Sequence, residues 1–411
     1  MNYRIKAPAC ATIRATIELP ASKSISNRVL ILNALSHIPC SIENLSDSDD
    51  TRVMEEALTS NARDFNVGAA GTAMRFLTAL LARTAGLWTL TGSERMKNRP
   101  VKLLVDALNS LGAHIVYTGN KGYPPLRISG RTLRGGEVAL EGGVSSQYIS
   151  ALLMIAPLME KGLTLRIEGP AVSAPYINLT IELMRRFGAE VERLGNVIRV
   201  LPREYTPIPF TVEPDWSAAS YWYAIAALAT DAVIRLPGLR KDSLQGDAAV
   251  AGIFACLGVE TEYSGEGVCL RNTGDRRSGM EYDFVNEPDL AQTLAVACTG
   301  LGIPFRFTGL QSLKIKETDR IEAIRTELLK LGYPVITSSD SILEWDGGRC
   351  GRGLLPVVST YEDHRMAMAF APLSLAHPEG IGIADTEVVT KSYPAFWNDL
   401  QKAGFEIAQS L

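Results

Sequence analysis

Four arginines stand at predicted helix starts that are widely separated in the chain. Arg28, Arg75, Arg320 and Arg365 each lie next to or within a predicted first turn. The helix dipole and the free N–H groups at that end favour negative charge, so cations recurring there indicate that an anion binds beside them. Arginine binds carboxylate and phosphate oxygens through paired hydrogen bonds, and small molecules bearing those groups are therefore the expected ligands.

Hydroxyl and acidic residues in the same segments have a simpler explanation. Ser145, Ser146 and Thr318 are of the type that caps helix N-termini, because their side-chain oxygens accept hydrogen bonds from free N–H groups. Capping also explains the acidic segment 47–50 better than a metal site does. It does not explain the arginines, which carry the prediction of an anion site.

The composition requires any cationic site to be local. The length of 411 residues suggests two domains, and 46% hydrophobic with 21% charged residues is typical of a globular protein with large cores. Because 41 Lys and Arg residues are outnumbered by 45 Asp and Glu residues, the formal net charge is -4. That balance argues against nucleic acid and against an anionic membrane as partners.

Cysteine and histidine usage gives no sign of a metal site. The six cysteines are scattered without Cys-x-x-Cys spacing, and none of the four histidines lies at ligand spacing from one. We therefore expect no metal and, from the scattered thiols, a cytoplasmic protein. His37, His114 and His377 have no partners in the sequence and are expected at the surface. The longest apolar stretch, 149–159, contains a proline and is too short to span a bilayer.

A pattern of helix stops recurs along the chain. Five predicted helices end in an apolar residue followed by glycine and a strand-like alternation, at Gly112, Gly188, Gly258, Gly332 and Gly404. Glycine takes the left-handed conformation just past a helix end at little cost, so each is a good stop. Successive glycines lie 76, 70, 74 and 72 residues apart, and this near-equal spacing predicts repeated units of about two helices and several strands.

Extending the repeat towards the N-terminus predicts six units in two groups of three, with the first unit shortened. A sixth helix stop is expected before residue 60, and only a predicted helix at 51–58 could supply it. The segment 59–67 then leaves little room for the paired strands of a full unit.

The polar segments that carry the cations are expected just before these helices or in their first turns. Segment 20–28 is expected to precede a helix at 29–35, segment 68–75 to open a helix that runs to 83, and segment 143–147 to open one that runs to 159. Further helices are expected to start at 288–289, 314–320 and 362–365. Lys391 is expected just before a helix that begins near Pro394.

Six short motifs, taken in order, resemble the 5-enolpyruvylshikimate-3-phosphate synthases, the 3-phosphoshikimate 1-carboxyvinyltransferase family. The motifs are SKSISNR at 22–28, AGTAMR at 70–75, RMKNRP at 95–100, VSSQ at 144–147, KETDR at 316–320 and DHRM at 363–366. No single motif identifies the family, but the ordered set spans the chain from about residue 19 to Lys391.

The resemblance implies an α/β (α+β) fold, a two-domain inside-out α/β barrel of six repeated βαβαββ-type units with the first unit truncated. One domain is expected to be discontinuous, with three units in residues 1–20 and 213–411. The other is expected to hold three units in 21–212, and the proline-rich stretch 202–214 would be the second crossover between domains.

The resemblance also implies the reaction. The expected activity is transfer of the enolpyruvyl (1-carboxyvinyl) group of phosphoenolpyruvate to the 5-hydroxyl of shikimate 3-phosphate, with release of phosphate by addition and elimination. This step belongs to the shikimate pathway to chorismate and the aromatic amino acids. The partners are the two small-molecule substrates, no cofactor is required, and a monomer is expected.

Residue roles carry over from the family motif by motif. For shikimate 3-phosphate the resemblance implies Lys23, Ser24, Arg28, Ser145, Ser146, Gln147, Ser173, Tyr176, Asp289, Ser312 and Lys316. For phosphoenolpyruvate it implies Lys23, Gly71, Arg99, Gln147, Arg320, Arg365 and Lys391. Asp289 is the expected base at the 5-hydroxyl, and the candidates for proton transfer at the enolpyruvyl carbons are Glu317, Lys23 and His364.

Three neutral positions depart from the family pattern. The family usually has asparagine at Ala69, and often has glycine at Ala21 and asparagine at Ser312. These departures concern local contacts and leave every proposed charged group in place.

Two other functions stay open at the level of sequence. The related enolpyruvyl transferase that acts on UDP-N-acetylglucosamine typically carries a reactive cysteine on the loop corresponding to 91–100, where this chain has none. A non-catalytic relative that binds only anions or a partner protein would be expected to lack Asp289, Glu317 or the arginines, and all of them are present.

Overall fold

The chain divides into two compact units. Unit 1 comprises Met1–Pro20 and Glu213–Leu411, and unit 2 comprises Ala21–Val212. The structure is a computed structural model that describes residues 1–143, 145–170, 172–351, 353 and 356–410, so Val144 of one family motif lies outside the described residues. Asp215 N donates to Pro20 O at 2.9 Å, which joins the two places where the chain leaves unit 1 and returns to it.

Unit 1 contains three four-stranded sheets among its described residues, and all three share one pattern. The strand orders are β14-β15-β13-β2, β16-β17-β19-β18 and β20-β21-β1-β22. In each sheet one pair of neighbouring strands is parallel and the other two pairs are antiparallel. The strands are β1 (Asn2–Lys6), β2 (Thr12–Thr16), β13 (Asp231–Pro237), β14 (Val259–Ser264), β15 (Gly267–Asn272), β16 (Met280–Asp283), β17 (Phe305–Thr308), β18 (Ile336–Ser338), β19 (Ile342–Trp345), β20 (Val357–Val358), β21 (Ile381–Ile383) and β22 (Glu406–Ser410).

Unit 2 repeats the pattern twice and then shortens it. Its sheets β4-β5-β7-β6 and β10-β11-β9-β8 again combine one parallel pair with two antiparallel pairs, whereas β3 and β12 form a parallel pair alone. The strands are β3 (Ile42–Glu43), β4 (Asp64–Asn66), β5 (Gly86–Thr91), β6 (His114–Tyr117), β7 (Leu126–Gly130), β8 (Gly136–Glu141), β9 (Leu163–Glu168), β10 (Val191–Leu194), β11 (Val197–Val200) and β12 (Phe210–Thr211). The shortened unit thus keeps the parallel pair and lacks the two antiparallel strands among the residues described.

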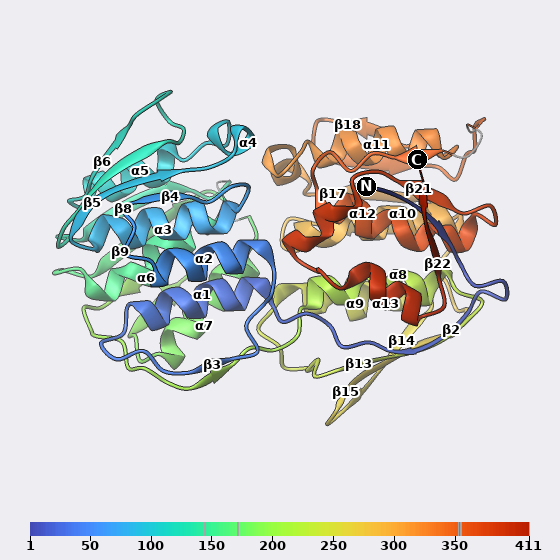
Figure 1. Ribbon diagram of the computed structural model, residues 1–411, viewed down its shortest axis with the longest axis horizontal. Helices are drawn as coiled ribbons and strands as arrows, with labels where there is room; N and C mark the ends of the chain where they lie inside the picture. The colour runs from blue at the N-terminus through green and yellow to red at the C-terminus, as the bar shows by residue number, and fades with distance from the viewer. Residues whose placement is uncertain (144, 171, 352, 354–355, 411) are drawn as a thin grey trace. The chain divides into compact units, whose positions relative to one another are not determined.

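The helices of unit 2 pack against one another inside it, where α3 contacts α2 and α6, and α6 contacts α7 (Figure 1). Helix α3 is buried from Gly71 to Ala82, as expected for a helix that is apolar on most sides. The helices are α1 (Lys23–Ala34), α2 (Asp49–Thr59), α3 (Gly71–Arg83), α4 (Glu94–Lys97), α5 (Lys102–Ser110), α6 (Ser146–Ile155), the 3-10 helix η1 (Ala156–Leu158) and α7 (Ala174–Arg186).

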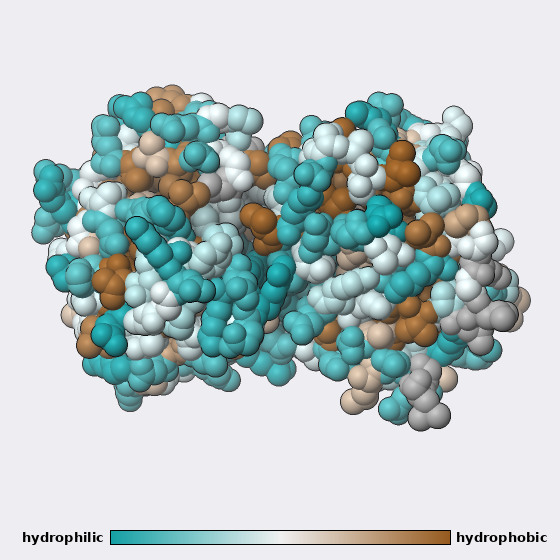
Figure 2. Space-filling view, turned by 90° about the horizontal axis from the view of Figure 1, so that it is seen from above, coloured by the Kyte–Doolittle hydropathy of each residue, from teal (hydrophilic) through white to brown (hydrophobic). Residues whose placement is uncertain are grey.

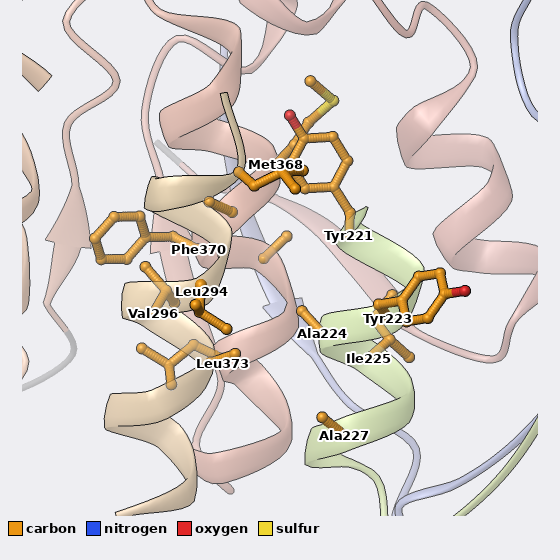
Figure 3. Close-up of a cluster of buried hydrophobic side chains, with 14 of the residues drawn as sticks. Tyr221, Tyr223, Ala224, Ile225, Ala227, Leu294, Val296, Met368, Phe370 and Leu373 are labelled. Atoms are coloured by element: carbon orange, nitrogen blue, oxygen red, sulfur yellow. The ribbon is translucent and has the colours of Figure 1, made fainter. Parts of the chain in front are cut away.

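The core of unit 1 lies among α8, α10 and the segment from α12 into η5. Figure 3 shows Tyr221 of α8 beside Met368 of α12, with Leu294 of α10 in the same cluster, and all three are buried. The helices of this unit are α8 (Trp216–Leu228), η2 (Gly246–Ala249), α9 (Val250–Ala255), η3 (Pro288–Leu290), α10 (Ala291–Leu301), η4 (Gln311–Ile315), α11 (Arg320–Lys330), α12 (His364–Phe370), η5 (Ala371–Ala376), η6 (Thr386–Lys391) and α13 (Phe396–Lys402).

The predicted helix stops are confirmed. The five repeat glycines all have positive φ, from 82° at Gly258 to 106° at Gly112. At four of the five stops the residue after the glycine also donates its N–H back across the last turn, as Ala113 N does to Leu108 O at 3.0 Å. This is the Schellman arrangement, which satisfies carbonyl groups that the helix end leaves free.

The predicted start of the first helix is wrong. Helix α1 begins at Lys23 rather than at residue 29, so Lys23, Ser24 and Arg28 belong to the helix itself. Arg28 therefore lies more than one turn inside α1, and Arg75 lies one turn inside α3, which begins at Gly71. Arg320 and Arg365 do lie in first turns.

Hydrophilic residues dominate the face drawn in Figure 2, where apolar residues form small separate patches. His37 and His114 are exposed as predicted, but His377 is buried and its Nε2 lies 3.1 Å from Tyr333 Oη, a partner 44 residues away. Among the residues described, no helix combines the length and the apolar character needed to cross a membrane.

Candidate functional site

Asp289 lies at the centre of a group of charged side chains in unit 1. Its Oδ1 accepts a hydrogen bond from Arg320 Nη1 at 3.0 Å and lies 3.7 Å from Lys316 Nζ. Its Oδ2 accepts one from Arg365 Nη2 at 2.8 Å. These groups come from η3, from the start of α11 with the segment before it, and from the start of α12, so three helix starts bring one carboxylate and three cations together.

Asp363 contacts the side chain of Arg320 and the backbone of Arg365. It is the N-cap of α12, where its Oδ1 accepts a hydrogen bond from Arg365 N at 2.9 Å. Its Oδ2 also accepts one from Arg320 Nε at 2.7 Å. A residue that the sequence explains as a helix cap therefore also orients the guanidinium group of Arg320.

Glu317 links Arg320 to a fourth cation. Its Oε2 accepts a hydrogen bond from Arg320 Nη2 at 2.9 Å, and its Oε1 lies 3.0 Å from Lys391 Nζ at the end of η6. His364 is buried beside this group, with its Nδ1 3.7 Å from Asp363 Oδ1. We call the charged residues the unit 1 charge cluster; its members are Asp289, Lys316, Glu317, Arg320, Asp363, Arg365 and Lys391.

The unit 1 charge cluster has four cations and three carboxylates, and this excess shapes its pKa values. Burial disfavours the charged form of Asp289, but Arg365, Lys316 and Arg320 outweigh burial and hold the pKa of Asp289 well below its usual value. Burial lowers the pKa of Lys316, and the charge of Asp289 offsets this only in part. The carboxylates face cations, and no metal-binding group of three or more acidic, Cys or His side chains occurs in the part of the chain described.

Arg28 in unit 2 is a buried cation whose hydrogen-bond partners, unlike those of Arg320 and Arg365, include no carboxylate. Its Nε donates to Thr180 Oγ1 at 2.7 Å, its Nη1 to Ser24 O at 2.8 Å, and its Nη2 to Ser150 Oγ at 3.3 Å and Tyr176 O at 3.5 Å. All of these partners are neutral. Burial lowers the pKa of Arg28 to about 10. Burying a cation with neutral partners alone is costly, so an anionic ligand would be stabilised here.

Gly71 lies against two guanidinium groups at the start of α3. A Cβ added to Gly71 would lie 2.7 Å from Arg99 Nη1 and 3.1 Å from Arg75 Nη1. Arg75 Nη1 donates to Gly71 O at 3.0 Å, which fixes its guanidinium group beside the glycine. The absence of a side chain at Gly71 therefore keeps the space beside Arg99 open.

The remaining predicted residues of unit 2 stand at other helix starts. Ser145 caps α6, because its Oγ accepts a hydrogen bond from Gln147 N at 3.3 Å, so the capping explanation holds for this residue. Gln147 Nε2 donates to Thr72 Oγ1 at 3.2 Å and ties the start of α6 to that of α3. Ser146 is the first residue of α6 and is buried.

Three further predicted residues of unit 2 are Ser173, Lys23 and Tyr176, and Tyr176 lies in the first turn of α7. Ser173 precedes α7 with a φ of 57° and makes no capping hydrogen bond, so helix capping does not explain its hydroxyl. Lys23 Nζ lies 3.8 Å from Asp50 Oδ2, and both side chains are largely buried. The structure thus places Lys23 at the start of α1, Arg28 further inside the same helix, and Arg99 after α4.

The neutral departures from the family pattern have different surroundings. Ala69 is exposed and Ala21 is buried. Ser312 Oγ is buried and has no hydrogen-bond partner among the residues described. An unsatisfied buried hydroxyl is costly, so Ser312 is the departure for which a bound polar group would matter most.

Sequence reasoning missed Asp247 as well as the second role of Asp363. Asp247 is buried in η2 and accepts a hydrogen bond from the hydroxyl of Ser217. Burial, together with the nearby charge of Asp289, raises the pKa of Asp247 to about 7. Asp247 follows Gly246 and belongs to none of the sequence motifs, so the sequence does not mark it as a site residue.

Known proteins match this chain over nearly its whole length. The family model for EPSP synthase (3-phosphoshikimate 1-carboxyvinyltransferase) matches residues 9–60 and 56–400. The chain is 57% identical over 408 residues to the 3-phosphoshikimate 1-carboxyvinyltransferase of Bacteroides fragilis, which covers 99% of each chain. It is 39% identical over 427 residues to the enzyme of the same name from Bordetella pertussis, with 95% of this chain and 96% of the relative covered.

A solved structure with a similar fold is that of the EPSP synthase from Acinetobacter baumannii. It superposes with a TM-score of 0.79 at 22% identity and covers 100% of both chains. The predicted fold class, an inside-out α/β barrel of six repeated units with the first truncated, is confirmed by this likeness and by the six sheets found in the described residues. From the family match and the full-length relatives, the chain belongs to the EPSP synthase (3-phosphoshikimate 1-carboxyvinyltransferase) family.

Proposed function

We propose that this chain transfers the 1-carboxyvinyl group of phosphoenolpyruvate to the 5-hydroxyl of shikimate 3-phosphate and releases phosphate. The observation that carries the proposal is the unit 1 charge cluster, where Asp289 lies against two arginines and a lysine. Both substrates are multiply anionic, and each unit charge placed about 4 Å from a cation gains about 4 kcal/mol at an effective dielectric constant of 20. Several cations are needed to hold two mutually repelling anions in reacting positions.

The proposed binding roles follow the division of the chain into units. In unit 2, Lys23, Ser24 and Arg28 bind shikimate 3-phosphate together with Ser145, Ser146, Ser173 and Tyr176, and Arg99 and Gly71 bind phosphoenolpyruvate. Gln147 contacts both substrates. In unit 1, Arg320, Arg365 and Lys391 bind phosphoenolpyruvate, and Lys316 and Ser312 bind shikimate 3-phosphate. The two compact units act as the two domains of the enzyme, and both contribute residues to turnover.

The proposed chemistry has two steps. In the addition, the 5-hydroxyl oxygen bonds to C2 of phosphoenolpyruvate, Asp289 accepts the hydroxyl proton, and an acid protonates the C3 methylene carbon. In the elimination, C3 loses a proton and the C2–O bond to phosphate breaks, which restores the double bond. Lys23, Glu317 and His364 are the candidates for the proton transfers at carbon.

The ion pairs of Asp289 imply that substrate binds before Asp289 acts as a base in the addition step. A carboxylate whose pKa lies well below its usual value is a weak base, so Asp289 is a poor proton acceptor while it pairs with Arg320 and Arg365. Anionic oxygens of phosphoenolpyruvate compete for the same guanidinium groups. Substrate binding would therefore weaken these ion pairs and raise the pKa of Asp289 just when a base is needed.

The test is release of phosphate by the purified protein given shikimate 3-phosphate and phosphoenolpyruvate. A parallel reaction replaces the shikimate acceptor with UDP-N-acetylglucosamine. Phosphate release that depends on the shikimate acceptor supports the proposal. Release only with the nucleotide sugar, or with neither acceptor, refutes it.

The cytoplasm and a monomeric state are proposed as the setting of this activity. The scattered single cysteines support a reducing compartment, since the described cysteines are all free thiols. Fractionation of the source cells tests the location, and light scattering on the purified protein tests the monomer.

A further inference from the structure

The segment that leads into α12 has a strained backbone. Tyr361 and Glu362 have φ values of 54° and 57°, the left-handed region that side chains other than glycine rarely adopt. They directly precede Asp363, His364 and Arg365, whose positions depend on how the chain enters the helix. Two consecutive left-handed residues persist only when surrounding groups hold them in place.

Glu327 of α11 supplies that restraint. Its side chain is fully buried, and its Oε1 accepts a hydrogen bond from Tyr361 Oη at 2.5 Å. Its Oε2 accepts one from Ser359 N at 3.1 Å. Lys330 Nζ lies 2.7 Å from both oxygens and neutralises the carboxylate. One buried carboxylate thus fixes a backbone N–H and a side chain on either side of Thr360.

The same helix also holds the far end of the segment. Arg320 and Glu327 are seven residues apart, which places them on one face of α11 about 10 Å apart along its axis. Arg320 binds Asp363 through Nε, at 2.7 Å, and Glu327 binds Ser359 and Tyr361. Residues 359–363 are therefore attached to one rigid helix at two separate points.

We propose that Glu327 is a positioning residue for the reaction, acting through the strained segment 359–362 to place His364 and Arg365. Glu327 pairs with Lys330 and is not a member of the unit 1 charge cluster. The effect on turnover rests on the proposed function; the effect on the position of His364 does not. Phosphoenolpyruvate is the substrate affected, because Arg365 and His364 act on it.

The main test compares Glu327→Gln with wild type in the full chain. The amide keeps the size of the side chain but leaves fewer acceptors for Tyr361, Ser359 and Lys330. A displacement of about 1 Å at a reacting group costs up to about 100-fold in rate. We therefore expect kcat/KM for phosphoenolpyruvate to fall about 10- to 100-fold while KM for shikimate 3-phosphate stays within about twofold of the wild-type value. A rise in KM for shikimate 3-phosphate as large as the fall in kcat/KM for phosphoenolpyruvate, or no fall in that kcat/KM, would overturn the proposal.

Two further variants separate positioning from folding. Tyr361→Phe removes one hydrogen bond from a partly exposed residue and should lower kcat/KM for phosphoenolpyruvate several-fold even if Glu327→Gln fails to fold. Glu322→Gln is the matched control, because Glu322 is an exposed residue of the same helix that pairs with Arg325. The proposal expects this control to behave as wild type; a loss in Glu322→Gln equal to that in Tyr361→Phe contradicts it.

A spectroscopic test does not depend on turnover. The chain has four histidines, so the imidazole signal of His364 can be assigned by comparison with His364→Gln. This signal should shift in Tyr361→Phe and in Glu327→Gln but not in Glu322→Gln. If the wild type shows no turnover yet the His364 signal shifts, the proposed function fails and the positioning role stands. If the wild type is active and the signal stays unchanged in both variants, the positioning role fails.

Discussion

Replacing Asp289 with asparagine should separate anion binding from turnover. The unit 1 charge cluster has four cations and three carboxylates, so Asp289→Asn raises its formal excess from one positive charge to two. An anionic oxygen about 4 Å from the lost carboxylate would gain up to about 4 kcal/mol at an effective dielectric constant of 20. Screening and side-chain rearrangement reduce this gain, and we expect inorganic phosphate to bind about 10- to 100-fold more tightly.

The same change should nearly abolish turnover. A positioned general base contributes about 100- to 10,000-fold to a rate, so kcat of Asp289→Asn should fall by that factor. Calorimetric titration with phosphate and the phosphate-release assay measure the two effects on one preparation. Asp231→Asn is the control, because Asp231 is an exposed carboxylate paired with Arg14 in the same unit. If Asp289→Asn binds phosphate no more tightly than wild type and keeps most of its turnover, the account of the cluster is wrong.

The pH dependence of stability gives an independent check on Asp289. Its pKa is lower in the folded chain than in the unfolded one, so its carboxylate stabilises the fold above the unfolded value of about 4. That stabilisation is lost as the pH falls through the folded value. The free energy of unfolding of Asp289→Asn should therefore depend less on pH below about 4, as denaturant melts at several pH values would reveal.

Three further predictions concern single residues. Arg28→Met should weaken shikimate 3-phosphate binding by at least about 100-fold without lowering the melting temperature, since the arginine has only neutral partners; a large fall in melting temperature would contradict this. Gly71→Ala should raise KM for phosphoenolpyruvate, because its Cβ would lie 2.7 Å from Arg99 Nη1, and an unchanged KM would argue against that contact. Gly404→Ala should lower the free energy of unfolding by about 1–2 kcal/mol, because alanine is strained at the φ of 92° found there, and it should leave the kinetic constants unchanged. An unchanged free energy of unfolding in denaturant melts would refute this prediction.

The repeat was predictable from the sequence because its signal is local. Each helix stop needs only a glycine with an apolar residue before it, so Gly112 and its counterparts mark the units without knowledge of the fold. The shortened unit was predictable for the same reason, since the short spacing around residue 60 leaves no room for a full set of strands.

The start of α1 was missed because its polar residues are buried by distant partners. Ser26 Oγ accepts a hydrogen bond from Ser46 N at 3.0 Å, and Asn27 Oδ1 accepts one from Thr51 Oγ1 at 2.9 Å. Those partners lie 20 and 24 residues away. A prediction from hydrophobic periodicity assigns such a polar stretch to a loop, because it recognises a helix only by its buried apolar residues.

Asp363 shows a similar limit within the site. Its position before a helix predicts a cap, and the cap is present. Its second role, holding Arg320, requires the starts of α11 and α12 to lie next to each other, which no spacing along the chain reveals. Asp247 was missed for the same reason, because its raised pKa depends on burial and on a charge 42 residues away.

The hydrogen bond between Asp215 N and Pro20 O makes unit 2 an insertion with adjoining ends. A segment whose entry and exit meet can be moved, excised or reconnected without stretching its host. The protein can therefore be read as one continuous three-sheet body interrupted once by another. Joining residue 20 directly to residue 213 would give unit 1 as one continuous chain, and residues 21–212 would form a separate segment with its own termini.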